Sequence, residues 1–507
     1  MRKIRLLALC FLLSAFLGAC GVGGSDAEEY ESYIIEEIAC LSDYEFDTDE
    51  DECTPEYVYF LKDLDYMLYA LENNFALFDV AYWARDADIA AIIENVRVDV
   101  LSNPEMEADD FLTSMVYNFS PLRGVAHFMI ELPNSHTIVI NNTDVPASMM
   151  LTENTLARWH YPHVMNFYRS RLRLGNWSGE RPMRIEGSAR RLARLDRFIL
   201  FGKYDEVDEI NYALTQGNYD EAVRKIMNLG RNIDLRPNVT AEILKEDRIA
   251  YVSIDSFQFR NDPSSDEWYS DKEKIHSFFE GIRDYEHLII DIRRNEGGIP
   301  RFFEDVILRP IIDEAVQVAG LAFATRGYYS LETLDSVTEG TSFIPCTIGA
   351  FIGPADNRLR SISAMLEEFY LPELNMYDME RMDYGFPIHM ERLYPKRLER
   401  FDFQSAFGGN IWLLTSDVTG SAAQINAWLS KESDFATHVG ETTGGNFGGP
   451  RTAVALPNSG MIFRMDVLYV TDEHGRPLEA GTVPHHFNRE GMDALETTLE
   501  LIAEGIY

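Results

Sequence analysis

The stretch from Asn410 to Gly449 constrains the fold most, because it reads as a buried strand, a glycine turn and a helix in direct succession. An apolar run at 411–414 is followed by SDVTG and then by apolar residues at helical spacing from Ala422 onward. Ser421 therefore lies at the strand-to-helix turn, where the first backbone N–H groups of a helix are unpaired. A serine in this place can act as a nucleophile, with the N–H of Ala422 facing an oxyanion. The alternative is that Ser421 only caps the helix.

Three further segments carry motifs in a fixed order around this turn. DIRRNEGG follows a strand-like run and ends in Gly297 and Gly298. GETTGG begins at Gly440, and LEAGTVP begins at Leu478. Together with SAAQ at the turn, these segments resemble the motifs of the carboxyl-terminal processing (tail-specific) serine proteases and their tricorn-core relatives. The resemblance is good over the C-terminal half and loose over the N-terminal half, and it implies a serine endopeptidase that works through an acyl-enzyme.

The same resemblance assigns roles to residues near Ser421. The oxyanion would be met by the N–H of Ala422 and by one from Gly297 or Gly298, because glycine lets the backbone approach closely. Glu479 in LEAGTVP matches the position where the tricorn-like branch places a catalytic glutamate that supports the histidine. Its alternative role is that of a surface carboxylate at the end of a strand.

A lysine partner for the nucleophile is excluded by the sequence. Bacterial processing proteases carry this lysine in the segment where GETTGGNFGG has Asn446, and an asparagine cannot take a proton from a hydroxyl. Lys431 lies about 15 Å along the expected helix from Ser421, which is too far to serve. The sequence therefore predicts a tricorn-like branch without the lysine, in which a histidine is the base.

Two histidines compete for the role of general base. His127 stands in PLRGVAHFMI and His136 stands in PNSHTIVI. Spacing favours His127, because in relatives the base comes directly after an amphipathic helix, and the helical pattern from Phe111 leads to His127. His136 stays an alternative base, since it follows Ser135 as in tricorn-like relatives. Either histidine could instead be purely structural.

The N-terminus predicts a lipoprotein signal peptide at residues 1–19. Basic residues precede an apolar run that is too short to span a bilayer, for which about 20 residues are needed. The run ends in LGAC, which resembles a lipoprotein box that is cut before Cys20 and lipid-modified on its thiol. We therefore expect a protein of the cell envelope that faces the extracytoplasmic side and is anchored to a bacterial membrane by its lipid. An ordinary secretory cleavage that leaves Cys20 free is the alternative.

Composition limits the partners. The chain has 83 acidic and 45 basic residues and a formal net charge of −38, which disfavours nucleic acid because a phosphate backbone needs a basic face. A protein or peptide substrate is expected instead. Cys40 and Cys53 could form a disulfide in an exported chain, with Cys346 unpaired. The acidic run at 47–52 reads as a solvated turn more readily than as a calcium loop, and no CxxC or Cys/His cluster indicates a metal. No cofactor is expected.

The predicted fold class is α/β (α+β), with a crotonase-like, tail-specific protease core and a helical N-terminal domain. The insert in the catalytic domain could be a lid or a substrate wall. The expected parts are an acidic linker (20–55), a helical N-terminal domain with the candidate base (56–146), an insert of unknown role (147–238) and a catalytic domain (239–507) with a large insert at about 299–409.

Two other functions stay open. The first is a non-catalytic peptide- or protein-binding lipoprotein that keeps the protease fold. It is motivated by Asn446, by Gln424 where relatives often have glutamate, and by His485 where relatives have aspartate. The second is a sugar- or polymer-active hydrolase on the same fold, which has no paired-carboxylate motif to support it.

Overall fold

The computed structural model describes residues 55–106, 108–122, 125–131, 137–140, 143–146, 237–257, 266–338, 344–345, 351–354, 358–390, 392–398, 405–446, 451–456 and 462–506. Within these residues no helix is long and apolar enough to cross a membrane. Several sequence predictions lie outside the described residues. They concern the signal peptide, the acidic linker, Cys20, Cys40, Cys53, Cys346, His136 and nearly all of the 147–238 insert.

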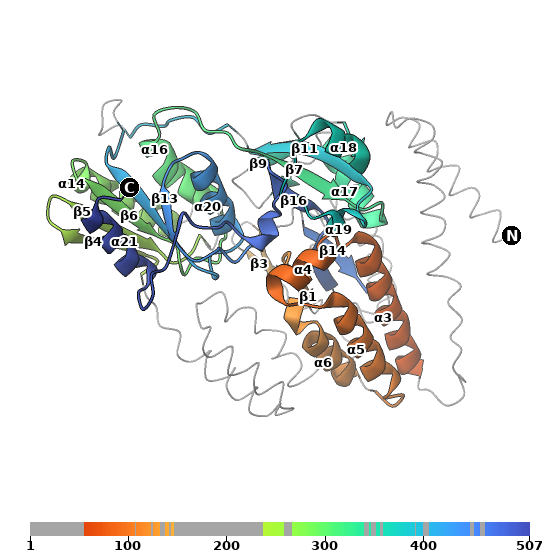
Figure 1. Ribbon diagram of the computed structural model, residues 1–507. Coiled ribbons are helices and arrows are strands. Elements are labelled where there is room, and N and C mark those ends of the chain that lie inside the picture. The colour runs from red at the N-terminus through yellow and green to blue at the C-terminus, as the bar shows by residue number, and fades with distance from the viewer. Residues whose placement is uncertain are drawn as a thin grey trace.

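A six-stranded sheet holds the segment that contains Ser421 (Figure 1). All neighbouring strands run parallel except β4, which pairs antiparallel with β5 at one edge. The expected strands before SDVTG and before DIRRNEGG are β12 and β6, and they are direct neighbours. Their carboxyl ends therefore bring the two turns together. In spatial order the strands are β17 (His486–Phe487), β13 (Thr437–Gly440), β12 (Asn410–Thr415), β6 (His287–Asp291), β5 (Ile249–Ile254) and β4 (Val239–Lys245).

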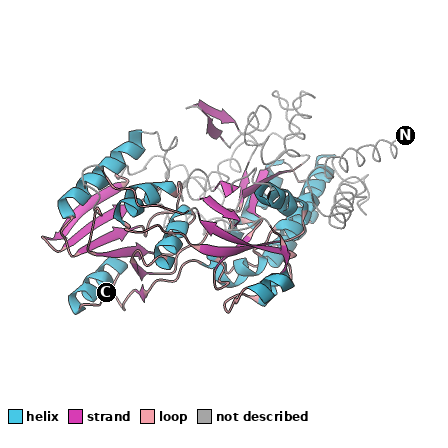
Figure 2. Ribbon diagram, turned by 90° about the horizontal axis from the view of Figure 1, so that it is seen from above, coloured by secondary structure: helices cyan, strands magenta, loops and turns pink. Residues whose placement is uncertain are grey.

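Helices cover both faces of this sheet (Figure 2). On one face lie α14 (Asp266–Ile282) and α20 (Ala422–Glu432). Every second strand residue points towards these helices and is buried by them, as Leu413 is. On the other face α21 (Ala494–Glu504) covers residues such as Trp412. Burial on both faces explains why the central strands are continuous apolar runs. The mixed α/β fold class predicted from the sequence is confirmed.

The large insert builds a second six-stranded sheet rather than an irregular lid. It is completed by β16 (Tyr469–Asp472), which comes from the C-terminal part of the chain and pairs with β7. The insert contributes α15 (Arg301–Phe303), the π-helix η3 (Glu304–Leu308), α16 (Arg309–Ile311), β7 (Ala319–Ala324), α17 (Tyr328–Thr338), β8 (Ile344–Pro345), β9 (Phe351–Pro354), β10 (Arg360–Ser361), α18 (Ile362–Glu368), α19 (Met376–Met379) and β11 (Tyr384–Met390).

The N-terminal part is helical, as the apolar periodicity predicts, and it packs on the second sheet. Its side chains share one core with Phe323 of β7 and Tyr469 of β16. Asn74 caps a distant helix, because its Oδ1 accepts the backbone N–H groups of Tyr329, at 2.8 Å, and of Ser330, at 3.2 Å. The elements are α3 (Pro55–Asn74), α4 (Phe78–Arg85), α5 (Ile89–Leu101), α6 (Ala108–Asn118) and the 3-10 turn η2 (Ser120–Leu122).

A small sheet joins this helical part to the C-terminal part of the chain. β1 (Met129–Glu131) pairs antiparallel with β15 (Ile462–Asp466), which in turn pairs with β14 (Arg451–Ala455). A separate hairpin is formed by β2 (Thr137–Ile140) and β3 (Thr143–Pro146). The first pairing places the segment just before β1, which contains His127, beside the catalytic half of the chain.

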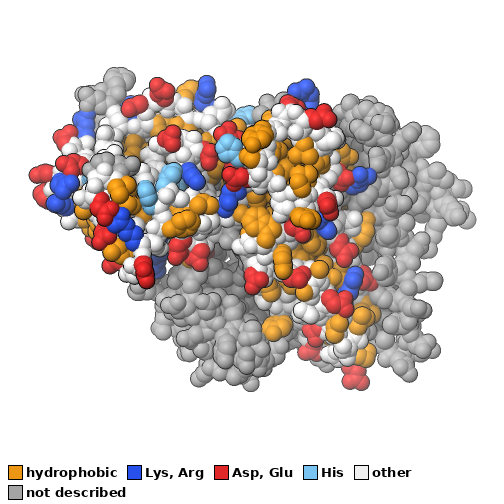
Figure 3. All heavy atoms as spheres, in the orientation of Figure 1, with side chains coloured by type: hydrophobic (Ala, Val, Ile, Leu, Met, Phe, Trp, Pro, Cys, Tyr) orange, Lys and Arg blue, Asp and Glu red, His pale blue; other side chains and the backbone are white. Residues whose placement is uncertain are grey.

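Acidic side chains do not gather into one patch on the face that Figure 3 shows. Asp and Glu side chains are scattered across the visible face and alternate with Lys and Arg (Figure 3). Such a distribution suits a solvated surface, since single charges at the surface are well hydrated.

Candidate active site

Ser421 occupies a strained turn between β12 and α20. Its backbone has φ 51° and ψ −120°, a region that residues other than glycine seldom adopt and that costs about 1–3 kcal/mol. Its N–H donates to the carbonyl of Gly445 at 2.9 Å, which fixes the turn. Although Ser421 holds the N-cap position of α20, its side chain makes no capping hydrogen bond. The helix-capping alternative for this hydroxyl is therefore wrong.

The Ser421 hydroxyl faces a histidine from the other end of the chain. Its Oγ lies 2.9 Å from Nε2 of His127, although 294 positions separate the two residues. This distance is within the range of about 2.6–3.2 Å over which a general base can take a proton. The His127 side chain is 11% exposed, so the pair is largely shielded from water. The structure thus brings Ser421 and His127 together, while the alternative base, His136, lies outside the described residues.

The turn that carries His127 is held from three sides. Ala126 and His127 have φ 47° and 52°, so two successive residues adopt the left-handed conformation. The N–H of Ala126 donates to Oε1 of Glu479 at 3.1 Å, and the N–H of His127 donates to Oδ1 of Asn446 at 2.7 Å. The carbonyl of Ala126 accepts the N–H of Asp466 at 3.1 Å. These bonds stabilise a conformation that the two residues would not adopt alone.

Asp466 binds the second nitrogen of the histidine ring, and sequence reasoning missed it. Its Oδ2 lies 2.7 Å from Nδ1 of His127, and its side chain is completely buried. The residue ends β15, where the sequence reads MIFRMDVLYV. A single acid within a mostly apolar run is a signal that could have singled it out, because buried carboxylates need a specific partner.

Glu479 is buried and faces the histidine turn, but it reaches the backbone and not Nδ1. It lies in the 3-10 turn η5 (Leu478–Ala480), and its carboxylate accepts the N–H of Ala126. The resemblance placed a glutamate here as support for the histidine. The hydrogen bond to the residue before His127 agrees with support of that turn, while the carboxylate on the imidazole itself is Asp466.

The glycine turn after β6 lies directly against the nucleophile. Gly297 has φ 104°, and a Cβ on it would come within 2.7 Å of Ser421 Cβ and of the backbone N of Ala422. Only glycine fits this approach. The N–H of Gly297 donates to Oδ1 of Asn295 at 2.9 Å, so it is not available to an oxyanion. Of the two glycines expected as alternatives for the second donor, Gly298 is the one that remains. The N–H groups of Gly298 and Ala422 donate to no group in the described part of the chain.

Asn295 organises this turn, and the sequence reasoning did not single it out within its motif. Its side chain donates to the carbonyl of Ile254 at 3.0 Å, and its own carbonyl accepts the N–H of Gly420 at 3.1 Å. The adjacent Glu296 does not bring negative charge to the site at neutral pH, because burial raises the pKa of its carboxyl to about 8. An oxyanion next to these glycines would therefore meet little repulsion.

The residues that depart from the family motifs have structural partners. Gln424 donates from Nε2 to the carbonyl of Leu478 at 3.1 Å and to Oγ1 of Thr482 at 3.0 Å, so it ties α20 to the Glu479 segment. Lys431 donates to the carbonyl of Val483 at 2.9 Å, which keeps its ammonium group at the far end of α20. His485 accepts the N–H of His438 on its Nδ1 at 2.9 Å.

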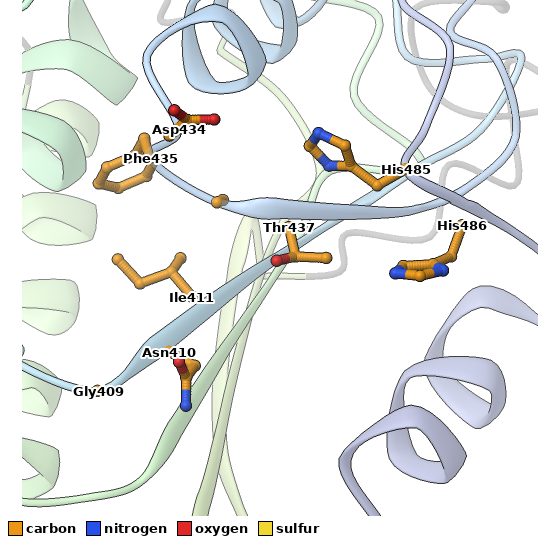
Figure 4. Close-up of a pocket in the computed structure, with 9 residues that line it drawn as sticks. Gly409, Asn410, Ile411, Asp434, Phe435, Thr437, His485 and His486 are labelled. Carbon is orange, nitrogen blue, oxygen red and sulfur yellow. The ribbon is translucent and has the colours of Figure 1, made fainter. Parts of the chain in front are cut away.

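A cavity of about 440 Å³ opens at the opposite end of the main sheet, away from Ser421. Asn410, Thr437, His485 and His486 are arranged around the amino ends of β12 and β13 (Figure 4). Next to it, His438 is completely buried, and neither of its ring nitrogens has a hydrogen-bond partner in the described part of the chain. Burial, with smaller contributions from His485 and Lys431, lowers its pKa to about 3.

The buried His438 should make the fold sensitive to mild acid. Its pKa is about 6.5 in the unfolded chain and about 3 in the folded one, so the unfolded state binds more protons between these values. Stability is therefore lost as pH falls through this window, by about 1.4 kcal/mol per pH unit. His438→Leu should remove this loss, so we expect the variant to gain about 2 kcal/mol relative to wild type between pH 7 and pH 5, measured by denaturant unfolding.

The matched control is His474→Leu, because the His474 side chain is 55% exposed. This variant should keep the pH dependence of the wild type. Parallel stability curves for His438→Leu and wild type would show that the buried ring is not the cause.

A serine at a strained strand-to-helix turn with a histidine on its hydroxyl is an arrangement typical of serine hydrolases. Residues 248–487 match the model of peptidase family S41, in agreement with the motifs. The matched part contains the Ser421, Asn446, Asp466 and Glu479 positions, and it begins after His127.

Solved structures resemble the chain at low identity. A candidate peptidase from Parabacteroides merdae is 14% identical, with a TM-score of 0.43, over 88% of this chain and 96% of its own. Mature CPAF in complex with lactacystin is 13% identical, with a TM-score of 0.44, over 89% and 97%. The photosystem II D1 C-terminal processing protease is 13% identical, with a TM-score of 0.29, over 50% and 49%.

Proposed function

We propose that this protein is a lipid-anchored, extracytoplasmic serine endopeptidase of peptidase family S41 that cleaves protein or peptide substrates through an acyl-enzyme. The observation that carries the proposal is the 2.9 Å contact between Ser421 Oγ and His127 Nε2 at a strained turn. A hydroxyl that serves only structure gains nothing from this strain, whereas a nucleophile gains exposure and a fixed direction of attack.

In the first step His127 takes the proton of Ser421 while the oxygen attacks the scissile carbonyl. The tetrahedral intermediate carries its negative charge beside the turn, where the N–H groups of Ala422 and Gly298 are the available donors. His127 then gives the proton to the leaving amine, and the acyl-enzyme remains. Water, deprotonated by the same histidine, attacks the ester carbonyl; the bond to Ser421 breaks, the histidine returns the proton to the serine oxygen, and the acid is released.

Glu479 and Asn446 keep the histidine in place during these steps. Both accept a backbone N–H from the turn that carries it. Since that turn is strained and belongs to a different part of the chain from Ser421, its position depends on such bonds. A displacement of about 1 Å would be enough to lower the rate strongly.

The proposed location rests on the N-terminal sequence. The LGAC segment after a short apolar run supports lipid attachment at Cys20, and the acidic surplus means that lipid and not charge would hold the protein at an anionic membrane. A polar spacer would then separate the enzyme from the bilayer.

Labelling with a fluorophosphonate probe tests the proposed activity. The probe phosphonylates serines that a base activates, so we expect the native protein to form one adduct, mapped by mass spectrometry to the peptide that contains Ser421. Acid-unfolded protein, in which Ser421 and His127 are apart, is the control and should not react.

The second candidate function is peptide binding without turnover, which Gln424 and His485 favour because relatives carry acids at these positions. A folded protein that binds unstructured peptides but neither reacts with the probe nor cleaves would refute the proposed peptidase and support this alternative.

A further inference from the structure

We propose that Asp466, and not Glu479, is the carboxylate that sets the tautomer and direction of the His127 ring, while Glu479 holds the turn through its backbone. This inference rests on the proposed function, in which His127 is the base. It makes Asp466 a positioning residue, because it acts on the substrate only through the histidine.

The contact between the ring and the carboxylate is direct. Nδ1 of His127 carries one proton at most, and the acceptor at 2.7 Å is Oδ2 of Asp466. The Asp466 side chain is completely buried, so water does not compete for this bond. A hydrogen bond to a charged acceptor in such a place is among the strongest in proteins.

Strand pairing fixes this contact. β1 and β15 pair antiparallel with Met129 opposite Arg464. The strand pairing ends before the histidine turn, where the carbonyl of Ala126 accepts the N–H of Asp466, the last residue of β15, at 3.1 Å. Asp466 therefore holds the histidine twice, by its backbone and by its carboxylate, and its position does not depend on a flexible side chain alone.

The two carboxylates differ in what their hydrogen bonds require. Glu479 accepts a backbone N–H, and the amide oxygen of a glutamine could do the same. Asp466 has to accept from Nδ1 so that the lone pair of Nε2 faces the Ser421 hydroxyl. An asparagine could turn its NH₂ group to Nδ1, which would place the proton on Nε2 and block proton uptake.

The charge of Asp466 has a second effect. When Ser421 transfers its proton to Nε2, the ring becomes an imidazolium with an anion beside Nδ1. Asp466 does not take this proton, which passes on to the leaving amine. The carboxylate thus stabilises the charge that forms in the transition state without taking part in bond exchange.

The test compares three substitutions that remove one carboxylate each. Asp466→Asn should lower kcat by about ten-thousandfold with KM changed less than about twofold. Glu479→Gln should lower kcat by less than about tenfold, since its hydrogen bond survives. Asp417→Asn is the matched control, because Asp417 is exposed on the same turn as Ser421, and it should keep the wild-type rate. Activity is followed on an unstructured protein substrate.

Two further measurements distinguish a positioning role of Asp466 from a purely structural one. In Asp466→Asn the acid limb of the pH profile of kcat/KM should move to lower pH, because loss of the anion disfavours the imidazolium. In wild type labelled with ¹⁵N-histidine, NMR should show a low-field Nδ1–H proton that is absent in His127→Ala and retained in Glu479→Gln. This measurement decides the inference even where Asp466→Asn does not fold.

Each outcome has a defined meaning. A folded Asp466→Asn with full activity, or a larger loss of kcat and of the low-field proton in Glu479→Gln, would overturn the role of Asp466 and leave the proposed peptidase standing. A wild type that neither cleaves nor reacts with the fluorophosphonate would refute the proposed function instead, and the NMR signal would still report which carboxylate binds Nδ1.

Discussion

Replacing Ser421 with alanine is expected to lower kcat by about a millionfold, the scale of loss when a catalytic serine is removed from a unit with its histidine. The substitution removes the atom that forms the acyl-enzyme, and the oxyanion donors alone give only weak catalysis. Since the hydroxyl makes no capping bond to α20, the melting temperature should change little. Cleavage of an unstructured protein substrate and a thermal melt measure the two effects.

A serine at the other end of the same helix provides the control. Ser433 follows α20 and donates to the carbonyl of Leu429, so Ser433→Ala should keep the wild-type kcat. Full cleavage by a well-folded Ser421→Ala protein would show that the nucleophile lies elsewhere.

His127→Ala should cost nearly as much as Ser421→Ala, because a serine without its base is a poor nucleophile at neutral pH. We expect kcat to fall by about 10⁵-fold or more, with little change in KM. The double variant Ser421→Ala/His127→Ala should be no slower than either single variant, since the two residues act as one unit. Steady-state kinetics on the same substrate provide the comparison.

The other sequence candidate for the base serves as the counter-test. His136→Ala should retain most of the activity if His127 is the base. An inactive but folded His136→Ala beside an active His127→Ala would assign the base to the NSHT segment and contradict the spacing argument.

Local pattern was enough to predict the turn between β12 and α20 and the glycine turn after β6. An apolar run of strand length followed by SDVTG leaves few alternatives, and two parallel neighbouring strands bring their following turns together. The amphipathic spacing before His127 was likewise sufficient to prefer it over His136 on sequence grounds. These inferences depend on residues close together in the chain.

Local pattern could mark Asp466 as an acid among apolar residues, but it could not identify His127 as its partner, because the two residues are 339 positions apart and are joined only by strand pairing. The register of β1 and β15 is set by the burial of both strands against the helical part, which no local pattern reveals. The same limit applies to the Gly297 donor. The Gly297 N–H is not free for an oxyanion because it donates to the Asn295 side chain. Tertiary contacts set the direction of that side chain, and the motif does not reveal it.

His127, the proposed base, lies outside the residues that match the S41 family model. The N-terminal helices share a core with the second sheet and lead into the turn that carries His127, and Asn74 at the N-terminus of α17 is one of the contacts between them and the insert. In the proposed peptidase, undocking of these helices would displace His127 from Ser421. The concentration of competent enzyme is thus the total concentration multiplied by the docked fraction. In the proposed peptidase, loosening this contact would lower kcat while KM stays constant, so the strength of an internal interface would set the rate of turnover.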